Sequence, residues 1–221
     1  AWAGCLPPAA RSCRSALVRA GGARAMQHYD DAPPSVAAIA AANVRVHGTS
    51  NAELLMEKIT RNKVYDSAYF KEQCFGLTAE TLVDKAFELH DIGGTYGGTR
   101  RPTRFLCLLT KLLQLQPARE VAIEYVRHAD NKYVRALGAM YWRVTASAVD
   151  VYTELEPLLA DYRKLRVCHG DDVYVTHMDE FIDELLTAER CLDVALPRIT
   201  QRHVLENFGE LAPRRSALDA E

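Results

Sequence analysis

The glycine-rich stretch from Gly93 to Gly98 is the first candidate for chemistry in this sequence. Clustered glycines expose backbone amides that can cradle a phosphate, but a nucleotide-binding P-loop also needs a lysine and a hydroxyl residue in fixed order. No Gly-Lys-Ser or Gly-Lys-Thr follows here, and no plain strand precedes the stretch. The glycines therefore favour a tight connection between two packed helices, which we expect to be neither helix nor strand.

Four residues in and just after this stretch are candidate partner-binding residues: Tyr96, Arg100, Arg101 and Arg104. An exposed tyrosine can anchor a neighbouring protein. The three arginines could form a small basic edge for a phosphate or an acidic partner, although arginines near a helix start commonly form only a solvated face. We predict a structural or partner-contacting role here, without nucleotide binding.

A cysteine–histidine cluster is the nearest approach to a metal site. It comprises Cys168, His169 and His177, with two aspartates between them. Because this spacing matches no structural zinc pattern, a hairpin with polar tips explains it better. We expect no metal ion and no other cofactor.

Catalytic carboxylates or nucleophiles would need a special environment, and the sequence offers none. Glu180, Asp183 and Glu184 share the outer face of an amphipathic helix, where nothing buries them enough to shift their acidity. No serine or cysteine lies in a recognisable nucleophile elbow. We therefore expect no catalytic residue and no enzymatic activity.

The amino-acid composition indicates the class of protein to which these residues belong. The 221 residues are 48% hydrophobic and 25% charged, which suits one ordinary globular domain with appendages. The chain has 27 basic and 29 acidic residues. This nearly neutral charge does not favour strong binding to phosphate backbones, so it favours protein partners. Three cysteines (Cys74, Cys107 and Cys191) lie beside apolar residues, which is typical of buried reduced thiols in the cytosol or nucleus. No apolar run approaches about 18 residues, so no membrane span is expected.

The chain divides into three segments. Residues 1–42 are rich in Ala, Pro and Arg, and we expect a disordered extension there. Its role stays open between a mobile tail, an organelle transit peptide, an upstream start (the first methionine is Met26) and an artefact. A helical domain is expected over residues 43–208, followed by a polar tail over residues 209–221.

Through the domain, apolar residues recur at helical spacing in segments separated by Pro and Gly. They predict helices over residues 51–59, 78–90, 102–113, 117–128, 132–148, 178–191 and 197–208. The helix that carries Phe105 to Leu113 is apolar around most of its circumference, so it should be central and least exposed. Two short alternating runs, 165–167 and 173–175, flank a Gly-Asp turn and predict one small β-hairpin. The expected fold is all-α, a single compact multi-helix domain with that one hairpin.

Several strings, read in order, closely resemble the pre-mRNA-splicing factor 38 family. They lie at residues 47–49, 74–80, 93–103, 105–108, 115–117, 132–139, 155–158, 161–164 and 179–186. The resemblance covers roughly residues 46–218 without large gaps. It departs from the family in the long Ala- and Arg-rich extension and in the missing acidic, Arg/Ser-rich tail of many animal members.

The resemblance implies a nuclear, non-catalytic protein-binding scaffold of the spliceosome. Such a protein would act when the tri-snRNP, the assembly of three small nuclear ribonucleoproteins, joins the pre-mRNA complex, and in the activation that follows. The implied partners are a zinc-finger splicing protein, extended helical splicing polypeptides and tri-snRNP components, with RNA contact only within the assembly and no membrane. The alternative is a splicing protein that binds RNA directly. Neither the surface that meets each partner nor the oligomeric state follows from the sequence.

Overall fold

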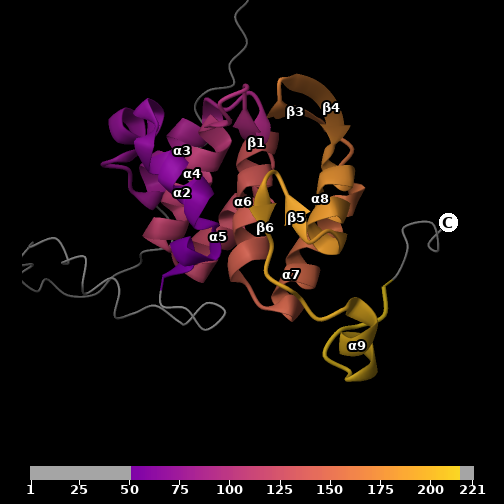
Figure 1. Ribbon diagram of the computed structural model, residues 1–221. Coiled ribbons are helices and arrows are strands. Elements are labelled where there is room, and N and C mark those ends of the chain that lie inside the picture. The colour runs from indigo at the N-terminus through magenta and orange to yellow at the C-terminus, as the bar shows by residue number, and fades with distance from the viewer. Residues whose placement is uncertain (1–50, 215–221) are drawn as a thin grey trace, which may run out of the picture. The chain divides into compact units, whose positions relative to one another are not determined.

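The computed structural model describes residues 51–214, and the chain over this range is mostly helical (Figure 1). The α-helices are α2 (Lys58–Asp66), α3 (Ala79–Phe87), α4 (Arg104–Leu115), α5 (Arg119–Arg127), α6 (Lys132–Thr145), α7 (Ala148–Leu155), α8 (Met178–Thr187) and α9 (Arg202–Asn207). Shorter turns are the 3-10 helices η1 (Ala52–Leu55) and η3 (Glu156–Ala160) and the π-helix η2 (Phe70–Cys74). The predicted disordered extension over residues 1–42 and most of the predicted polar tail lie outside the described residues.

Helices α4 and α6 form the centre of the apolar core (Figure 1). In α4, eight residues including Phe105, Leu109 and Leu113 are buried, which confirms the prediction of a buried central helix. In α6, every residue from Ala136 to Val144 is buried as well, so α4 shares the central position with it. One glycine brings α5 close to α6, because a Cβ on Gly138 would lie 2.6 Å from the carbonyl carbon of Tyr125.

Threonine side chains cap the starts of two helices. Thr78 begins α3 with a capping box, in which its amide donates to Thr81 Oγ1 at 2.9 Å. At α4 the cap is Thr103 and the helix begins at Arg104, two residues later than predicted, because Pro102 lies in a strand instead of the first helical turn. The hydroxyl of Thr103 accepts from the amide of Leu106 at 3.2 Å.

Several predicted helices are wrong in extent. The helix expected over residues 178–191 ends at Thr187, and the one expected over residues 132–148 ends at Thr145. The helix expected over residues 51–59 is broken at Met56, which adopts an extended conformation and is buried beside Thr110. As a result Leu54 and Ile59 do not share one buried helix face, and they are 51% and 70% exposed. The last helix begins at Arg202 and not at Pro197, because the residues before it run extended beside α7, where Tyr152 donates to the carbonyl of Thr200.

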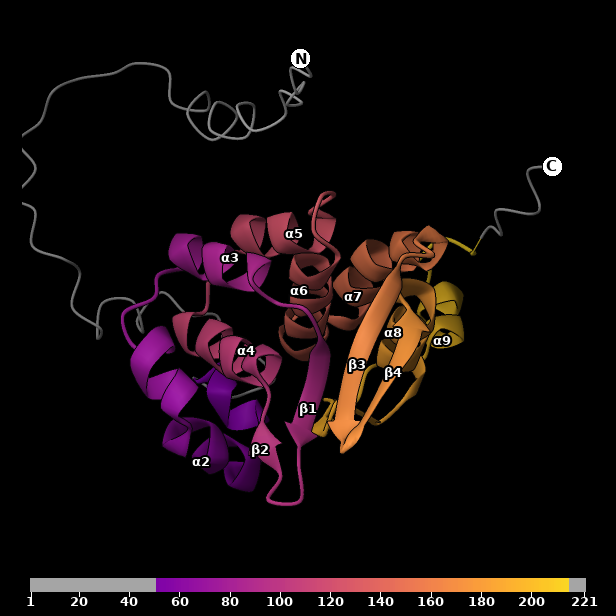
Figure 2. The ribbon, with the colours of Figure 1, turned by 90° about the horizontal axis from the view of Figure 1, so that it is seen from above.

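The structure has more β-strands than the single hairpin that the sequence predicted. They are β1 (Ile92–Tyr96), β2 (Arg101–Pro102), β3 (Lys164–Gly170), β4 (Asp172–His177), β5 (Arg190–Cys191) and β6 (Val194–Ala195). The predicted hairpin is confirmed as β3 and β4, paired in register from Lys164 with His177 to His169 with Asp172. β1 lies parallel to β3 and completes a four-stranded sheet of order β2-β1-β3-β4 (Figure 2), while β5 and β6 form a separate hairpin.

The expectation of an all-α domain with one hairpin is therefore corrected to a mostly helical domain with a four-stranded sheet. β1 and β3 are about 70 residues apart, and a parallel pair needs such a long crossover, here made by α4 to α7. A pairing of this range leaves no local signal in the sequence.

The first glycines of the Gly-rich stretch form a strand, contrary to the prediction that they would form a loop. A Cβ on Gly93 would lie 2.4 Å from the carbonyl oxygen of Cys168, and one on Gly94 would lie 2.3 Å from that of Leu192. Because no side chain fits at either position, β1 can pass between β3 and the β5–β6 turn only as glycine. We call this contact, made by Gly93, Gly94, Cys168, Leu192 and Asp193, the glycine seam.

Candidate partner-binding cleft

An open cleft of about 460 Å³ lies where the end of α3, the start of α4 and strands β1 to β3 meet. Its lining mixes aromatic, acidic and basic side chains: Tyr69, Glu88, His90, Asp91, Tyr96, Pro102, Thr103, Arg104 and Cys168. Figure 2 looks onto the face of the sheet beside it, which no helix of the described range covers.

Thr103, which lines the cleft, ties the start of α4 to strand β1. Its hydroxyl donates to the carbonyl of Gly93 at 2.7 Å, and its amide donates to the carbonyl of Gly94 at 3.0 Å. Since Thr103 also caps α4, the strand and the helix start are held in one arrangement. This arrangement places Arg104 of α4 and Tyr96 of β1 on the same cleft.

The four residues predicted to bind a partner are brought together in part. Tyr96 is 43% exposed and lines the cleft with Arg104, while Arg101 is the cross-strand neighbour of Tyr96. Arg100 lies in the turn between β1 and β2 with a φ of 49°, and it does not line the cleft. No ion pair within residues 51–214 involves any of the three arginines, so their charges face solvent.

Arg104 and Tyr69 form one wall of the cleft. The Arg104 guanidinium carbon lies 5.6 Å from the centre of the Tyr69 ring, within range of a cation–π contact. Desolvation by burial raises the pKa of Tyr69 to about 12, with a smaller contribution from the nearby Cys74 thiol. The phenol is therefore neutral at physiological pH. Its ring offers an apolar surface and its hydroxyl a hydrogen-bonding group.

Cys168 and Asp91 line the cleft near the pairing of β1 with β3. Burial raises the pKa of the Cys168 thiol, and the neighbouring carboxylate of Asp91 raises it further. A thiol with a raised pKa stays protonated at neutral pH and is a poor nucleophile. The cleft thus offers contact surface and charge rather than an activated group.

The buried cysteines behave as the sequence predicted. Cys74, Cys107 and Cys191 are buried and reduced. Desolvation raises the pKa of Cys74 to about 12 and that of Cys107 to about 11. They are structural thiols that pack in the core.

Sequence reasoning missed Tyr69, Asp91 and Cys168 as cleft residues. Cys168 reaches the cleft only through the parallel pairing of β3 with β1, and Tyr69 only through the packing of η2 beside α4. The acidic Asp91 just before the glycines was the one local signal that pointed to this place.

Within residues 51–214, no three His, Cys, Asp or Glu side chains come together as metal ligands. Cys168 and His177, members of the cluster considered above, belong to opposite ends of the β3–β4 ladder. In the same range no helix has the length and apolarity needed to cross a bilayer.

These features define a class: a mostly helical domain with a small four-stranded sheet and an open cleft beside it. The PRP38 family model matches residues 45–209. The chain is 54% identical over 175 residues to Pre-mRNA-splicing factor 38A of Xenopus laevis, covering 79% of this chain and 56% of that protein. It is also 54% identical to Pre-mRNA-splicing factor 38 of Arabidopsis thaliana, covering 49% of that protein.

Among solved structures, the chain resembles one in the crystal structure of the Snu23–Prp38–MFAP1(217–258) complex of Chaetomium thermophilum. The TM-score is 0.76 and the identity 41%, with 80% of this chain and 92% of that chain covered. The chain belongs to the PRP38 family, which confirms the resemblance read from its strings. It spans about half the length of the curated relatives it matches.

Proposed function

We propose that this chain is a non-catalytic scaffold of the spliceosome that binds other splicing proteins in the nucleus. The observation that carries the proposal is the similar chain from Chaetomium thermophilum, which was crystallised together with other splicing-complex proteins. At 41% identity over most of both chains, a shared mode of binding is the simplest expectation.

The partners in this proposal are a zinc-finger splicing protein, extended helical splicing polypeptides and tri-snRNP components. The cleft of Tyr96 and Arg104 is one of the contact surfaces, with Arg100 and Arg101 on its rim. An exposed aromatic ring supplies the anchor, whereas rim arginines mainly accelerate association with acidic partners. The step served is incorporation of the tri-snRNP and activation of the spliceosome.

The test is depletion of the endogenous protein from a nuclear splicing extract, followed by addition of this chain. We expect assembly to stall before activation in the depleted extract and to resume with the added chain. A Tyr96→Ala, Arg104→Glu double variant should rescue less well, whereas Val121→Ala, at an exposed position on α5, should rescue fully. Splicing that continues unimpaired after depletion would contradict the proposal.

Direct RNA binding is a second candidate function, favoured by the exposed arginines Arg100, Arg101 and Arg104, which follow Tyr96 closely in the chain. Binding through phosphate contacts weakens steeply with salt. Titration of naked RNA at rising salt would therefore separate the two functions, because a protein scaffold should show weak RNA binding at every ionic strength.

A further inference from the structure

The start of strand β3 is rich in basic residues. Residues 161–166 read Asp-Tyr-Arg-Lys-Leu-Arg, so three of the six are cations. Asp161 is the single carboxylate among them, and it already pairs with Arg163 and with Arg135 of α6, at 2.7 and 2.6 Å. Because two guanidinium groups share this one carboxylate, it does not neutralise the cations that follow.

Three further cations lie together on this part of the surface: Lys132, Lys164 and Arg166. Lys164 and Arg166 share the outer face of the sheet about 6.7 Å apart, because they are two residues apart on one strand. Lys132, in the first turn of α6, donates to the carbonyl of Lys164. No carboxylate within residues 51–214 forms an ion pair with any of the three. Positive charge is therefore concentrated here, in a chain whose net charge is -2.

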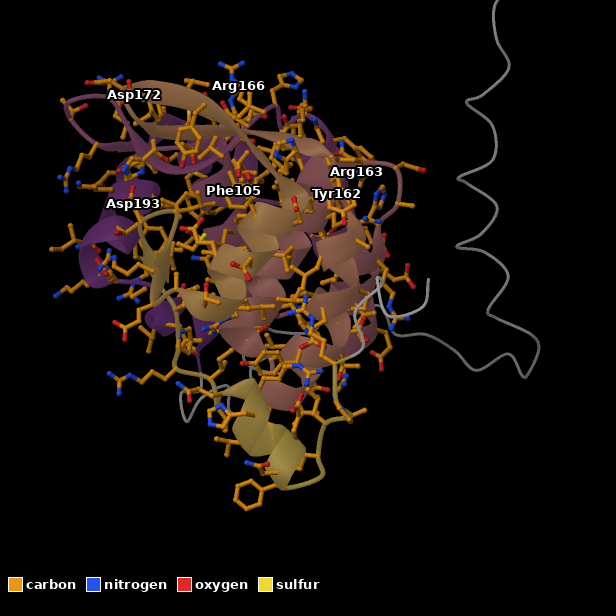
Figure 3. All side chains as sticks on the ribbon, turned by 90° about the vertical axis from the view of Figure 1, so that its right-hand side faces the viewer. Phe105, Tyr162, Arg163, Arg166, Asp172 and Asp193 are labelled. Atoms are coloured by element: carbon orange, nitrogen blue, oxygen red, sulfur yellow. The ribbon has the colours of Figure 1, made fainter. Side chains whose placement is uncertain are left out.

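Aromatic rings border these cations. Tyr162, between Asp161 and Arg163, is 72% exposed. The Nζ of Lys132 lies 5.2 Å from the centre of the Tyr133 ring, within range of a cation–π contact. In Figure 3 the Arg166 side chain points away from the body of the protein. We call Lys132, Tyr162, Lys164 and Arg166 the basic face.

We propose that the basic face binds a short stretch of single-stranded RNA. Its cations contact successive phosphates and the Tyr162 ring stacks on one base, which is the combination that single-strand-binding surfaces use. A protein partner suits this face less well, because protein interfaces are depleted in lysine. An RNA duplex also suits it less well, since paired bases stay stacked on one another and offer no face to Tyr162.

The basic face is separate from the arginines that follow Tyr96. Tyr96 pairs with Gly170, at the far end of β3 from Lys164, and Arg101 is its other cross-strand neighbour. Contacts with about three phosphates give weak binding by themselves. The RNA contact thus goes beyond the proposed scaffold function, which it supplements within an assembly without replacing protein binding.

The experiment titrates the full chain into a labelled single-stranded oligoadenylate of about ten nucleotides and follows fluorescence anisotropy. We expect weak binding at low salt. The logarithm of the affinity should fall with the logarithm of the salt concentration with a slope of about −2, as about three phosphate contacts require. A Lys164→Glu, Arg166→Glu double variant should lose about tenfold or more in affinity and reduce the magnitude of that slope by about 1.4. Both residues are exposed, so this variant should keep the thermal midpoint of the wild type.

Two further variants of Tyr162 test the stacking contact separately. Tyr162→Ala should lower the affinity about fivefold or more and leave the salt slope unchanged, because the ring carries no charge. Tyr162→Phe keeps the ring and should bind like the wild type.

The matched control for charge is a Lys58→Glu, Arg198→Glu double variant. Both residues are exposed and neither forms an ion pair within residues 51–214. The control makes the same change in net charge away from the basic face, so it should keep the wild-type affinity.

Several outcomes would overturn the proposal. No binding at low salt, or an equal loss in the control variant, would show that the basic face is not an RNA site. Binding lost with Arg100→Glu, Arg101→Glu and kept with Lys164→Glu, Arg166→Glu would place the RNA at the turn between β1 and β2. Equal affinity for an RNA duplex would reject stacking on Tyr162. A Lys164→Glu, Arg166→Glu variant that loses a splicing protein but keeps RNA would show that a protein occupies this face. The depletion assay tests the scaffold function independently of all these outcomes.

Discussion

The helical core around α4 and α6 is packed in the opposite way from the glycine seam, in which Gly93 and Gly94 are buried and Cys168, Leu192 and Asp193 are partly buried. In α4 and α6, large side chains such as Leu109 and Met140 fill the space between helices. In the glycine seam, backbone lies directly on backbone, and the missing side chains of Gly93 and Gly94 are what make room. We therefore expect the stability of the helical core to fall when a substitution removes side-chain atoms, and that of the glycine seam to fall when a substitution adds them.

The two regions also differ in how their backbones are held. The core helices have ordinary geometry, whereas Leu192 and Asp193 have φ angles of 49° and 63°, which L-residues rarely adopt. Asp193 Oδ2 accepts from the amide and the hydroxyl of Thr95, at 3.0 and 2.8 Å. These two hydrogen bonds hold the β5–β6 turn to β1. Figure 3 shows Asp193 on the other side of the molecule from Tyr162 and Arg163.

The largest expected effect is in the helical core. Leu109→Ala removes atoms from a fully buried position on α4 and should reduce the free energy of unfolding by about 2–5 kcal/mol. Urea denaturation followed by far-ultraviolet circular dichroism measures the change. Leu54→Ala, at a half-exposed position, is the control and should stay within about 0.5 kcal/mol of the wild type. An unchanged midpoint for Leu109→Ala would show that α4 is not central.

In the glycine seam, Gly94→Ala should destabilise the protein by about 1–3 kcal/mol, because its Cβ would overlap the backbone of Leu192. The matched control is Gly98→Ala, whose Cβ would meet nothing within 4 Å. That variant should be neutral or slightly more stable. Equal stability of both variants would mean that β1 and the β5–β6 turn are not in contact.

An ion pair network joins the helical region to the sheet, and it should respond to pH. Asp161, just before β3, accepts from Arg135 of α6 at 2.6 Å and from Arg163 at 2.7 Å. The hydrogen bonds from Arg163 lower the pKa of Asp161 to about 2. The stability it contributes, about 1–2 kcal/mol, is thus present above about pH 4 and lost as the pH falls toward 2.

Asp161→Asn tests this link between the regions. The variant should be less stable than the wild type at pH 7, and the difference should shrink as the pH approaches 2. Chemical denaturation at a series of pH values measures it. A difference that stays constant over that range would show that the carboxylate charge of Asp161 does not contribute.

The smallest effect on stability is expected in the cleft, which belongs to both regions. Tyr96→Ala should change the free energy of unfolding by no more than about 0.5 kcal/mol, because the ring is nearly half exposed. It should nevertheless weaken binding of a splicing partner by about tenfold if the ring is an anchor. Calorimetric titration with the Chaetomium thermophilum proteins measures this, and equal affinity would remove Tyr96 from the contact surface.

Much of the helical part of the fold was predictable from local patterns. The cap at Thr78, the buried face of α4 and the β3–β4 hairpin depend on residues close together in the chain. The same is true of the family, whose strings lie in order along the sequence. Tyr96 and Arg104 were also named from local context, one as an exposed aromatic and the other as a basic residue near a helix start.

The rest was decided by contacts between distant segments. Gly93 and Gly94 look like a loop in the sequence, because glycine lacks a side chain and disfavours strands. They form a strand only because the backbones of Cys168 and Leu192 approach closer than any side chain permits. The sequence alone determines where chain flexibility and apolar surface lie, but which distant backbone will occupy the space left by a glycine is set by tertiary packing.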